Sequence, residues 1–379
     1  MTPLSADQVE LVASSNDFSL ELFKKVNETE PDQNTFISPL SVGMALAMVY
    51  NGADGETKTQ IQETLGFEGL SSDELNQAFQ QLRNSLLQMD KKVNLNIANS
   101  VWYDQNYEVQ QQFKETMLAS YDAEVRGLDF SKAGSKDVIN SWVAGKTNDK
   151  IQNLLLSIPS DVVMYLINAV YFKADWTYQF DKAKTKPDIF YTPDATVARP
   201  DMMHSDGAKF LFYGNEQLKL IDLPYGNQQY SMTIILPEGG ITETFLQGLS
   251  ANTLQSWLDQ TKEASMQVVL PKFKSAYEKT LNEVLIDMGI ETAFTQNADL
   301  SNLLVGQDGL LISRVLHKAF IEVNEEGSEA AAATAVEIGL TSVSPAPPVM
   351  VVNRPFVYLI REKHTGAILF AGKMLNPLQ

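Results

Sequence analysis

The feature that most constrains this 379-residue sequence is a segment of small residues between positions 325 and 352. It begins with two glutamates, a glycine, a serine and a third glutamate, continues through a run of alanines from Ala330 to Ala333, and ends in a proline-rich stretch. Local propensity alone predicts a helix over the alanines, because alanine and glutamate are strong helix formers. That helix would have little amphipathicity and would bury little surface, so we expect it to be mobile.

The same segment also fits a strand, in which successive side chains point to opposite faces. One face then carries small or apolar side chains, namely Ser328, Ala330, Ala332, Thr334, Val336 and Ile338. The other face carries both acids, in the set Glu329, Ala331, Ala333, Ala335 and Glu337. No large side chain precedes Val336, so the leading end meets little steric resistance on entering a sheet. The segment suits two states, an exposed loop and an inserted strand.

The rest of the chain predicts an α+β fold in one interlocked domain, residues 1–379. Apolar residues at helical spacing predict helices around residues 18–26, 75–86 and 281–288, and a nearly continuous apolar run predicts a helix buried on all sides over 40–50. Strands are predicted at 95–103, 163–172, 232–236 and 266–270, with a hairpin formed by 356–361 and 368–372. Helices dominate early and strands late, without a linker or an internal repeat, which favours α+β over alternating βαβ units.

Composition excludes several classes of protein. The formal net charge of −18, without a dense Lys/Arg cluster, argues against binding to nucleic acid or anionic membranes. The absence of cysteine excludes disulfides, thiol nucleophiles and cysteine metal sites. The longest apolar runs fall well short of the roughly 20 residues that span a bilayer. No basic head or apolar stretch follows Met1, so we expect a soluble chain without a signal peptide.

The common catalytic motifs are missing, including phosphate loops, zinc-protease helices and nucleophile elbows. Only three histidines occur, and each has a structural interpretation. His204 lies in a polar stretch, His317 in an apolar strand where we expect a semi-buried, hydrogen-bonded ring, and His364 in a hairpin turn. We therefore predict that the protein is not an enzyme and needs no cofactor or metal.

Several motifs, in a fixed order along nearly the whole chain, carry a resemblance to a known family. They are Phe36-Ile37-Ser38-Pro39-Leu40-Ser41, Leu166-Ile167-Asn168-Ala169-Val170-Tyr171-Phe172-Lys173 with Trp176, Leu270-Pro271-Lys272-Phe273, His317-Lys318-Ala319, Asn353-Arg354-Pro355-Phe356 and Gly366-Ala367-Ile368-Leu369-Phe370-Ala371-Gly372. Together with the segment that starts at Glu325, they resemble the inhibitory serpins. The resemblance implies three β-sheets surrounded by about eight or nine helices, with an exposed reactive-centre loop near the C-terminus at about 325–352.

The resemblance also implies a mechanism. A serine protease attacks the loop as bait and forms an acyl-enzyme, and the cleaved loop then inserts into the largest sheet before the ester is hydrolysed; serpin loop insertion is a known case of strand addition. The expected function is suicide inhibition of serine proteases, with a covalent protease complex as the only partner and a monomeric inhibitor. We expect the protein to act outside the cell, as a secreted inhibitor. The alternative is a cytoplasmic location.

Site residues follow from the resemblance by position. The hinge of the loop comprises Glu325, Glu326, Gly327, Ser328, Glu329, Ala330, Ala331, Ala332 and Ala333. A hydrogen-bonded cluster under the opening strands comprises Ser38, Ser41, Asn168 and His317. Trp176 marks where the loop first inserts, and Lys272 pairs with Glu325 to hold the base of the loop. Ser328 replaces the commoner threonine but keeps a small hydroxyl.

Two ways of counting place the bait bond differently. Counting from the hinge gives cleavage between Thr341 and Ser342, whereas counting back from Arg354 lands near Ser344 and makes Val343–Ser344 the alternative. Cleavage directly before Pro345 is disfavoured, because proline fixes the backbone and lacks an N–H. No Lys or Arg lies between 325 and 352. With Leu340 as the preceding subsite residue, the bond suits elastase-like or subtilisin-like proteases.

Two other functions compete with inhibition. A non-inhibitory serpin, acting as carrier, chaperone or storage protein, usually has a bulky or charged hinge, and the alanines argue against it here. A glycosaminoglycan-activated regulator needs a basic helix, but residues 75–89 carry only Arg83, with Lys91 and Lys92 just beyond. We therefore expect no dependence on heparin.

Overall fold

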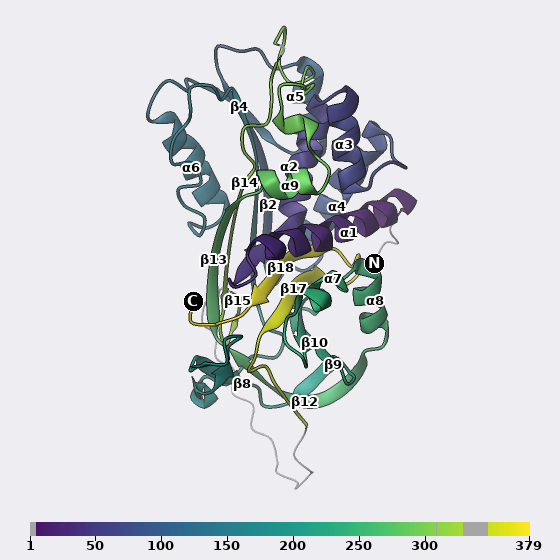
Figure 1. The fold of residues 1–379 in the computed structure, drawn as a ribbon, viewed down its shortest axis with the longest axis vertical. Helices are drawn as coiled ribbons and strands as arrows, with labels where there is room; N and C mark the ends of the chain where they lie inside the picture. The colour runs from purple at the N-terminus through teal and green to yellow at the C-terminus, as the bar shows by residue number, and fades with distance from the viewer. Residues whose placement is uncertain (1–4, 308, 329–347) are drawn as a thin grey trace.

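The computed structural model describes residues 5–307, 309–328 and 348–379 (Figure 1). In this part of the chain the strands form three sheets, accompanied by nine α-helices, so the expected α+β class and number of sheets are confirmed. The predicted hinge residues Glu329, Ala330, Ala331, Ala332 and Ala333, together with Leu340 and both candidate bonds, Thr341–Ser342 and Val343–Ser344, lie outside the described residues.

The sheet that positions the site has six strands. In spatial order they are β13 (Phe273–Thr280), β14 (Leu316–Val323), β15 (Gly327–Ser328), β4 (Met164–Asp175), β2 (Val93–Asp104) and β3 (Glu124–Leu128). The predicted strands at 95–103 and 163–172 are antiparallel neighbours, with Ala98 opposite Ala169. Alternate residues of β4 face two apolar cores: Ile167 packs in one, and Val170 in the other. This alternation explains why both faces of the sheet are covered.

A ten-stranded sheet and a small hairpin complete the β structure. The large sheet contains β1 (Thr35–Ile37), β18 (Ile368–Met374), β17 (Phe356–Glu362), β11 (Tyr230–Pro237), β10 (Leu218–Tyr225), β9 (Ala208–Gly214), β12 (Lys262–Pro271), β8 (Asp201–His204) and β5 (Lys186–Pro187), with β16 (Val349–Val351) parallel to β12. The hairpin joins β6 (Phe190–Tyr191) and β7 (Val197–Ala198). The predicted C-terminal hairpin is confirmed as β17 and β18.

Most of the helices lie in the upper part of the molecule in Figure 1, and the two that follow β11 and precede β12 lie lower, beside the ten-stranded sheet. The helices are α1 (Ala6–Thr29), α2 (Pro39–Gly52), α3 (Gly55–Leu65), α4 (Ser72–Gln88), α5 (Gln111–Tyr121), α6 (Ser135–Lys146), α7 (Glu243–Gln247), α8 (Ala251–Asp259) and α9 (Asn282–Asp287), with short 3-10 turns at Lys182–Lys184 and Thr292–Phe294. No helix in the described ranges is long and apolar enough to cross a membrane.

Two helices matter most for the site, because they cover opposite faces of the six-stranded sheet. The apolar run at 40–50 forms α2, which begins with Pro39 in its first turn and is buried along most of its length, as predicted. Helix α6 lies on the other face, where Ile139 and Val143 pack with Trp102 and Ile167. Strand β4 is therefore held between two helices.

Candidate functional site

The first described hinge residues form a strand within the six-stranded sheet. Strand β15 lies between β4 and β14, with Gly327 opposite Asp175 and Ser328 opposite Ala174 on one side. On the other side, Ser328 pairs with Val323. The chain thus begins to add a strand to the sheet at the point where the segment described above starts.

Only glycine fits at position 327. A Cβ atom there would lie 2.1 Å from the carbonyl oxygen of Ala174 and 2.6 Å from the Cα of Asp175, both of them backbone atoms. The turn into β15 is fixed by Asn324, whose side-chain oxygen accepts hydrogen bonds from the backbone N–H groups of Glu326 and Gly327 at 3.0 and 3.2 Å. The close approach of two backbones explains why the hinge carries glycine here.

Ser328 is held by a tyrosine that the sequence analysis did not identify. Its hydroxyl lies 2.6 Å from the hydroxyl of Tyr225, and both residues are buried. The Tyr225 ring stacks on Trp176, with centroids 4.3 Å apart and an interplanar angle of 11°. Trp176 in turn donates its indole N–H to the carbonyl oxygen of Asn324 at 2.9 Å. Burial raises the pKa of Tyr225, so the phenol stays neutral and able to donate.

Charged groups hold the two residues before the glycine. The Nζ of Lys272 lies 3.0 Å from a carboxylate oxygen of Glu325, and Lys182 pairs with Glu326. Burial alone would raise the pKa of the Glu325 carboxyl, but a hydrogen bond from its own backbone N–H and the Lys272 ammonium lower it below its ordinary value. The backbone N–H groups of Trp176 and Phe180 donate to the carbonyl oxygens of Glu326 and Glu325, at 2.7 and 2.9 Å respectively.

Of these partners, the sequence analysis identified Trp176 and the Lys272–Glu325 pair, and the structure places all three at the hinge. It did not identify Lys182, Tyr225 or Asn324. Lys182 and Tyr225 lie in segments that carry no motif, so no signal in a single sequence distinguishes them. Asn324 directly precedes the hinge, and an asparagine before a glycine-containing segment is a turn signal in the sequence.

The predicted cluster of Ser38, Ser41, Asn168 and His317 gathers between α2, β4 and β14. His317 is buried, and its Nε2 accepts the backbone N–H of Ser38 at 3.2 Å, while the Ser38 hydroxyl donates to the carbonyl oxygen of Leu369 at 2.9 Å. Burial lowers the pKa of His317 to about 4, so the ring is neutral at physiological pH. The ring is more deeply buried than the semi-buried position expected from the sequence.

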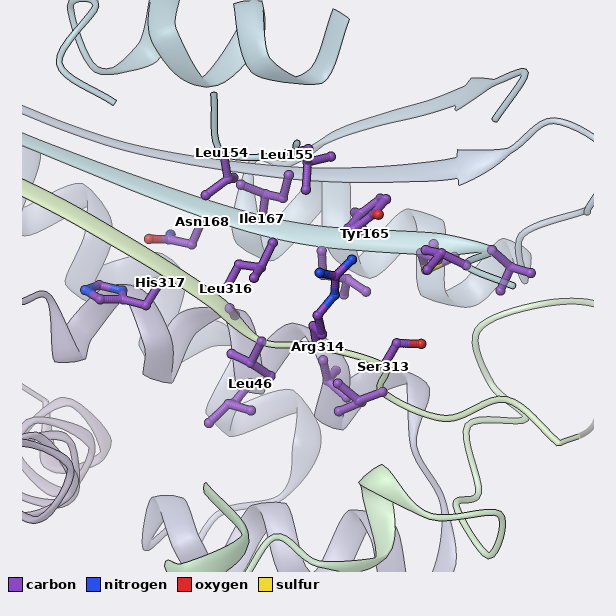
Figure 2. A pocket seen from close by; sticks show the side chains of 18 of the residues that line it. Leu46, Leu154, Leu155, Tyr165, Ile167, Asn168, Ser313, Arg314, Leu316 and His317 are labelled. Carbon is purple, nitrogen blue, oxygen red and sulfur yellow. The ribbon is translucent and has the colours of Figure 1, made fainter. Parts of the chain in front are cut away.

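Asn168 belongs to the same cluster but lies across from His317, on β4 (Figure 2). The Ser41 hydroxyl donates to its backbone carbonyl at 3.2 Å, and its side-chain N–H donates to Asn99 at 2.6 Å. Its side-chain oxygen is buried and, within the part of the chain that the structure describes, has no hydrogen-bond partner. The analysis of the sequence missed Asn99, which lies on the neighbouring strand β2.

Beyond β15, strands β4 and β14 do not pair with each other in the described chain. Among the strands that the structure describes, β14 pairs only with β13 and β15, and β4 only with β2 and β15. A cavity of about 360 Å³ lies between them, and we call this region the β4–β14 gap. Backbone groups on both sides of the gap are available for a further strand, which would complete two ladders at once.

The chemistry of the described residues does not suggest a metal centre. No group of three or more His, Asp or Glu side chains in those ranges is arranged to hold a metal ion. His204 is the last residue of β8, 26 residues before Tyr230, the first residue of β11. His364 lies exposed in the turn between β17 and β18. Neither histidine lies in the predicted cluster around the gap.

Comparisons with known proteins agree with this geometry. A family model described as "Serpin (serine protease inhibitor)" matches residues 13–377. Iripin-8 of Ixodes ricinus is 36% identical, over 98% of this chain and 94% of that protein. The structure of human thyroxine-binding globulin complexed with thyroxine has a TM-score of 0.89 at 31% identity, covering 98% of this chain and 100% of that one. The structure of Tengpin, a thermophilic serpin in its native state, has a TM-score of 0.88 at 32% identity. The match covers 99% of this chain and 95% of that one.

Proposed function

Because this chain belongs to the serpin family, we propose that it inhibits serine proteases and traps its target by inserting the cleaved reactive loop into the β4–β14 gap. The protease is the partner, held as a covalent acyl-enzyme, and the inhibitor acts as a monomer. The proposal includes a secreted protein that works outside the cell.

One observation carries this proposal: the hinge already occupies the first two strand positions, and the gap continues directly beyond them. Gly327 and Ser328 both pair with β4, and Ser328 also pairs with β14, whereas farther along the described residues of β4 and β14 do not pair with each other. Successive added residues would form backbone hydrogen bonds to β4 and to β14 in turn, and they would bury apolar surface. Both gains favour the inserted state.

The orientation of the Ser328 side chain indicates which side chains of an inserted strand would enter the core. Its side chain is buried against Tyr225. Because strand residues alternate between faces, Ala330 and Ala332 would point the same way, and Ala331 would point outward. Small side chains on the inner face meet little resistance, which favours fast insertion.

Speed matters because the trapped ester is reactive. The serine hydroxyl of the protease attacks the carbonyl carbon of Thr341, and the amine of Ser342 leaves with the proton, which forms the acyl-enzyme. Water would then hydrolyse the ester and release active protease. Insertion competes with this second step, so the outcome depends on the rate at which the hinge extends β15.

The loop composition supports a target class. No basic residue lies between 325 and 352, so a trypsin-like pocket has no charged side chain to bind. We propose cleavage between Thr341 and Ser342, with Leu340 in the preceding subsite, by elastase-like or subtilisin-like proteases.

The decisive experiment incubates the full chain with elastase, subtilisin and trypsin, and analyses the products by denaturing electrophoresis and mass spectrometry. We expect an adduct with elastase or subtilisin that survives boiling in detergent, and a released peptide that starts at Ser342. A peptide starting at Ser344 would move the bond but keep the function. Complete cleavage without an adduct would contradict inhibition and favour a carrier.

The carrier alternative has one observation in its favour, the cavity in the β4–β14 gap, which is large enough for a small molecule. Similarity to a globulin that binds thyroxine keeps this function open. Melting temperature separates the two: an inhibitor becomes much harder to melt after loop cleavage, because the inserted strand completes the sheet, whereas a carrier whose loop stays outside would not.

A further inference from the structure

The cavity in the β4–β14 gap has the composition of a ligand site. It passes between the two strands, from α2 on one face of the sheet to the segment after α6 on the other (Figure 2). Its volume of about 360 Å³ lies in the range of small-molecule sites, roughly 300–1,000 Å³. Its walls are largely leucine and isoleucine, including Leu46, Leu154, Leu155, Ile167 and Leu316.

Polar groups converge at one end of this apolar chamber. Figure 2 shows the Arg314 side chain extending from the segment before β14 toward Tyr165 of β4. Arg314 is exposed, and no carboxylate among the described residues lies within ion-pair distance of it. The Tyr165 hydroxyl is buried and has no hydrogen-bond partner among those residues. A buried hydroxyl without a hydrogen-bond partner, beside a guanidinium that no carboxylate neutralises, favours an anionic acceptor at the mouth of the apolar cavity.

One acidic residue also lines the cavity. Asp161 is exposed and precedes β4, so its carboxylate would repel an anion bound at the mouth. The net charge of −18 opposes anions at long range, but salt screens charges beyond about 8 Å at physiological ionic strength. The nearby charges of Arg314 and Asp161 therefore decide how strongly the mouth of the cavity prefers an anion.

We infer that this cavity binds one amphipathic anion, a medium-chain alkyl carboxylate. The alkyl chain lies among Leu46, Leu155 and Ile167, and the carboxylate accepts hydrogen bonds from the Arg314 guanidinium and the Tyr165 hydroxyl. Burial of the alkyl chain supplies most of the affinity, because each methylene that leaves water adds to it. The two donors select the charged headgroup and orient the chain.

Binding has a consequence for inhibition that rests on the proposed function. The ligand fills the path along which β15 would extend, so the ligand and the inserted strand exclude each other. The bound protein would then release more active protease for each cleaved loop.

The test uses the intact, uncleaved protein and decanoate as the probe, by isothermal titration calorimetry below the micelle concentration. We expect one site for decanoate and weaker binding of the uncharged decanol and the cationic decylamine. Arg314→Gln should weaken decanoate binding about tenfold, because a charge-assisted hydrogen bond is lost. Asp161→Asn should strengthen binding about threefold by removing repulsion. Arg199→Gln makes the same charge change at an exposed position outside the cavity lining and should leave the affinity unchanged.

Binding of decanol as tight as that of decanoate, or an equal loss of affinity in the Arg314 and Arg199 variants, would overturn the inference. Absence of any decanoate binding would overturn it too, even if protease is trapped normally. Conversely, decanoate binding with the expected response of both variants would sustain it, even if no protease adduct forms. The calorimetry and the protease assay therefore distinguish failure of the ligand site from failure of the proposed inhibition.

Discussion

The hydroxyl groups of Tyr225 and Ser328 lie 2.6 Å apart, closed to solvent, although 103 positions separate them in the sequence. Tyr225 ends β10 in the ten-stranded sheet, and Ser328 lies in the six-stranded sheet. The contact therefore joins the two large sheets at the point where the loop begins. It holds Ser328 in strand β15, next to β4.

Tyr225→Phe should destabilise the protein, because the Ser328 hydroxyl is left buried without this partner. We expect the free energy of unfolding to fall by about 1–2 kcal/mol. In a double-mutant cycle, Ser328→Ala should have a smaller effect in the Tyr225→Phe background than in the wild type. Urea unfolding measures both, with Tyr191→Phe as the exposed control. Strictly additive effects would contradict the contact.

Gly327→Ala should convert the inhibitor toward a substrate. The added Cβ would lie 2.1 Å from a backbone oxygen, so the hinge cannot keep its place between β4 and β14. The number of inhibitor molecules consumed for each protease trapped should rise severalfold. Gly145→Ala in α6 is the matched control, because nothing lies within 4 Å of its new Cβ. An unchanged stoichiometry for Gly327→Ala would show that insertion does not pass through this position.

Ala332→Arg and Ala331→Arg test which face of the extended strand points inward. An arginine at 332 would enter the core, and burial of an unpaired charge is strongly unfavourable. We expect cleavage at the same bond but release of active protease. An arginine at 331 would point to solvent and should leave trapping nearly intact. Equal trapping by both variants, measured on denaturing gels, would refute the assigned face.

His317 should make stability depend on pH. Its pKa is about 4 in the folded protein and ordinarily 6.5, so between these values the unfolded chain binds a proton that the native state does not. The free energy of unfolding should therefore fall as pH is lowered from 6.5 to 4, by about 1.4 kcal/mol for each pH unit. His317→Gln keeps a side-chain acceptor for Ser38 and should remove this slope. His364→Gln, at an exposed site, should follow the wild type. A slope that survives His317→Gln would assign the effect to other groups.

Lys272→Gln should destabilise the base of the hinge, because the Glu325 side chain is only 6% exposed and loses its cation. We expect a loss of about 1–2 kcal/mol in the free energy of unfolding. Lys274→Gln is the control two residues away. Its pair with Glu322 is more exposed, so the loss should stay below about 0.5 kcal/mol. Equal losses in the two variants would mean that burial of Glu325 does not matter.

Much of the framework could be predicted, because its signals are local. The apolar run at 40–50 specified the buried helix α2, and β-rich runs specified β2, β4 and the C-terminal hairpin. The order of short motifs indicated the family before any contact was known. It also placed Trp176, Lys272 and Glu325 together, although they are far apart in the chain.

The partners of those residues depended on the fold. Tyr225 ends a strand that is buried except at Lys219, and in the sequence it resembles any other apolar residue of a central strand. Asn99 and Arg314 likewise carry no signal of their own, since each gains its role from a side chain that approaches from another element.

The sequence by itself determined the family and the elements, and it predicted a loop that can be either exposed or inserted, because periodicity and propensity act between near neighbours. Only the tertiary structure decided that Gly327 and Ser328 occupy two strand positions, and that an apolar cavity with a buried, unpaired tyrosine hydroxyl beside an arginine lies beyond them. Such features arise where separate segments pack together, and the space left between them is not encoded in any one segment.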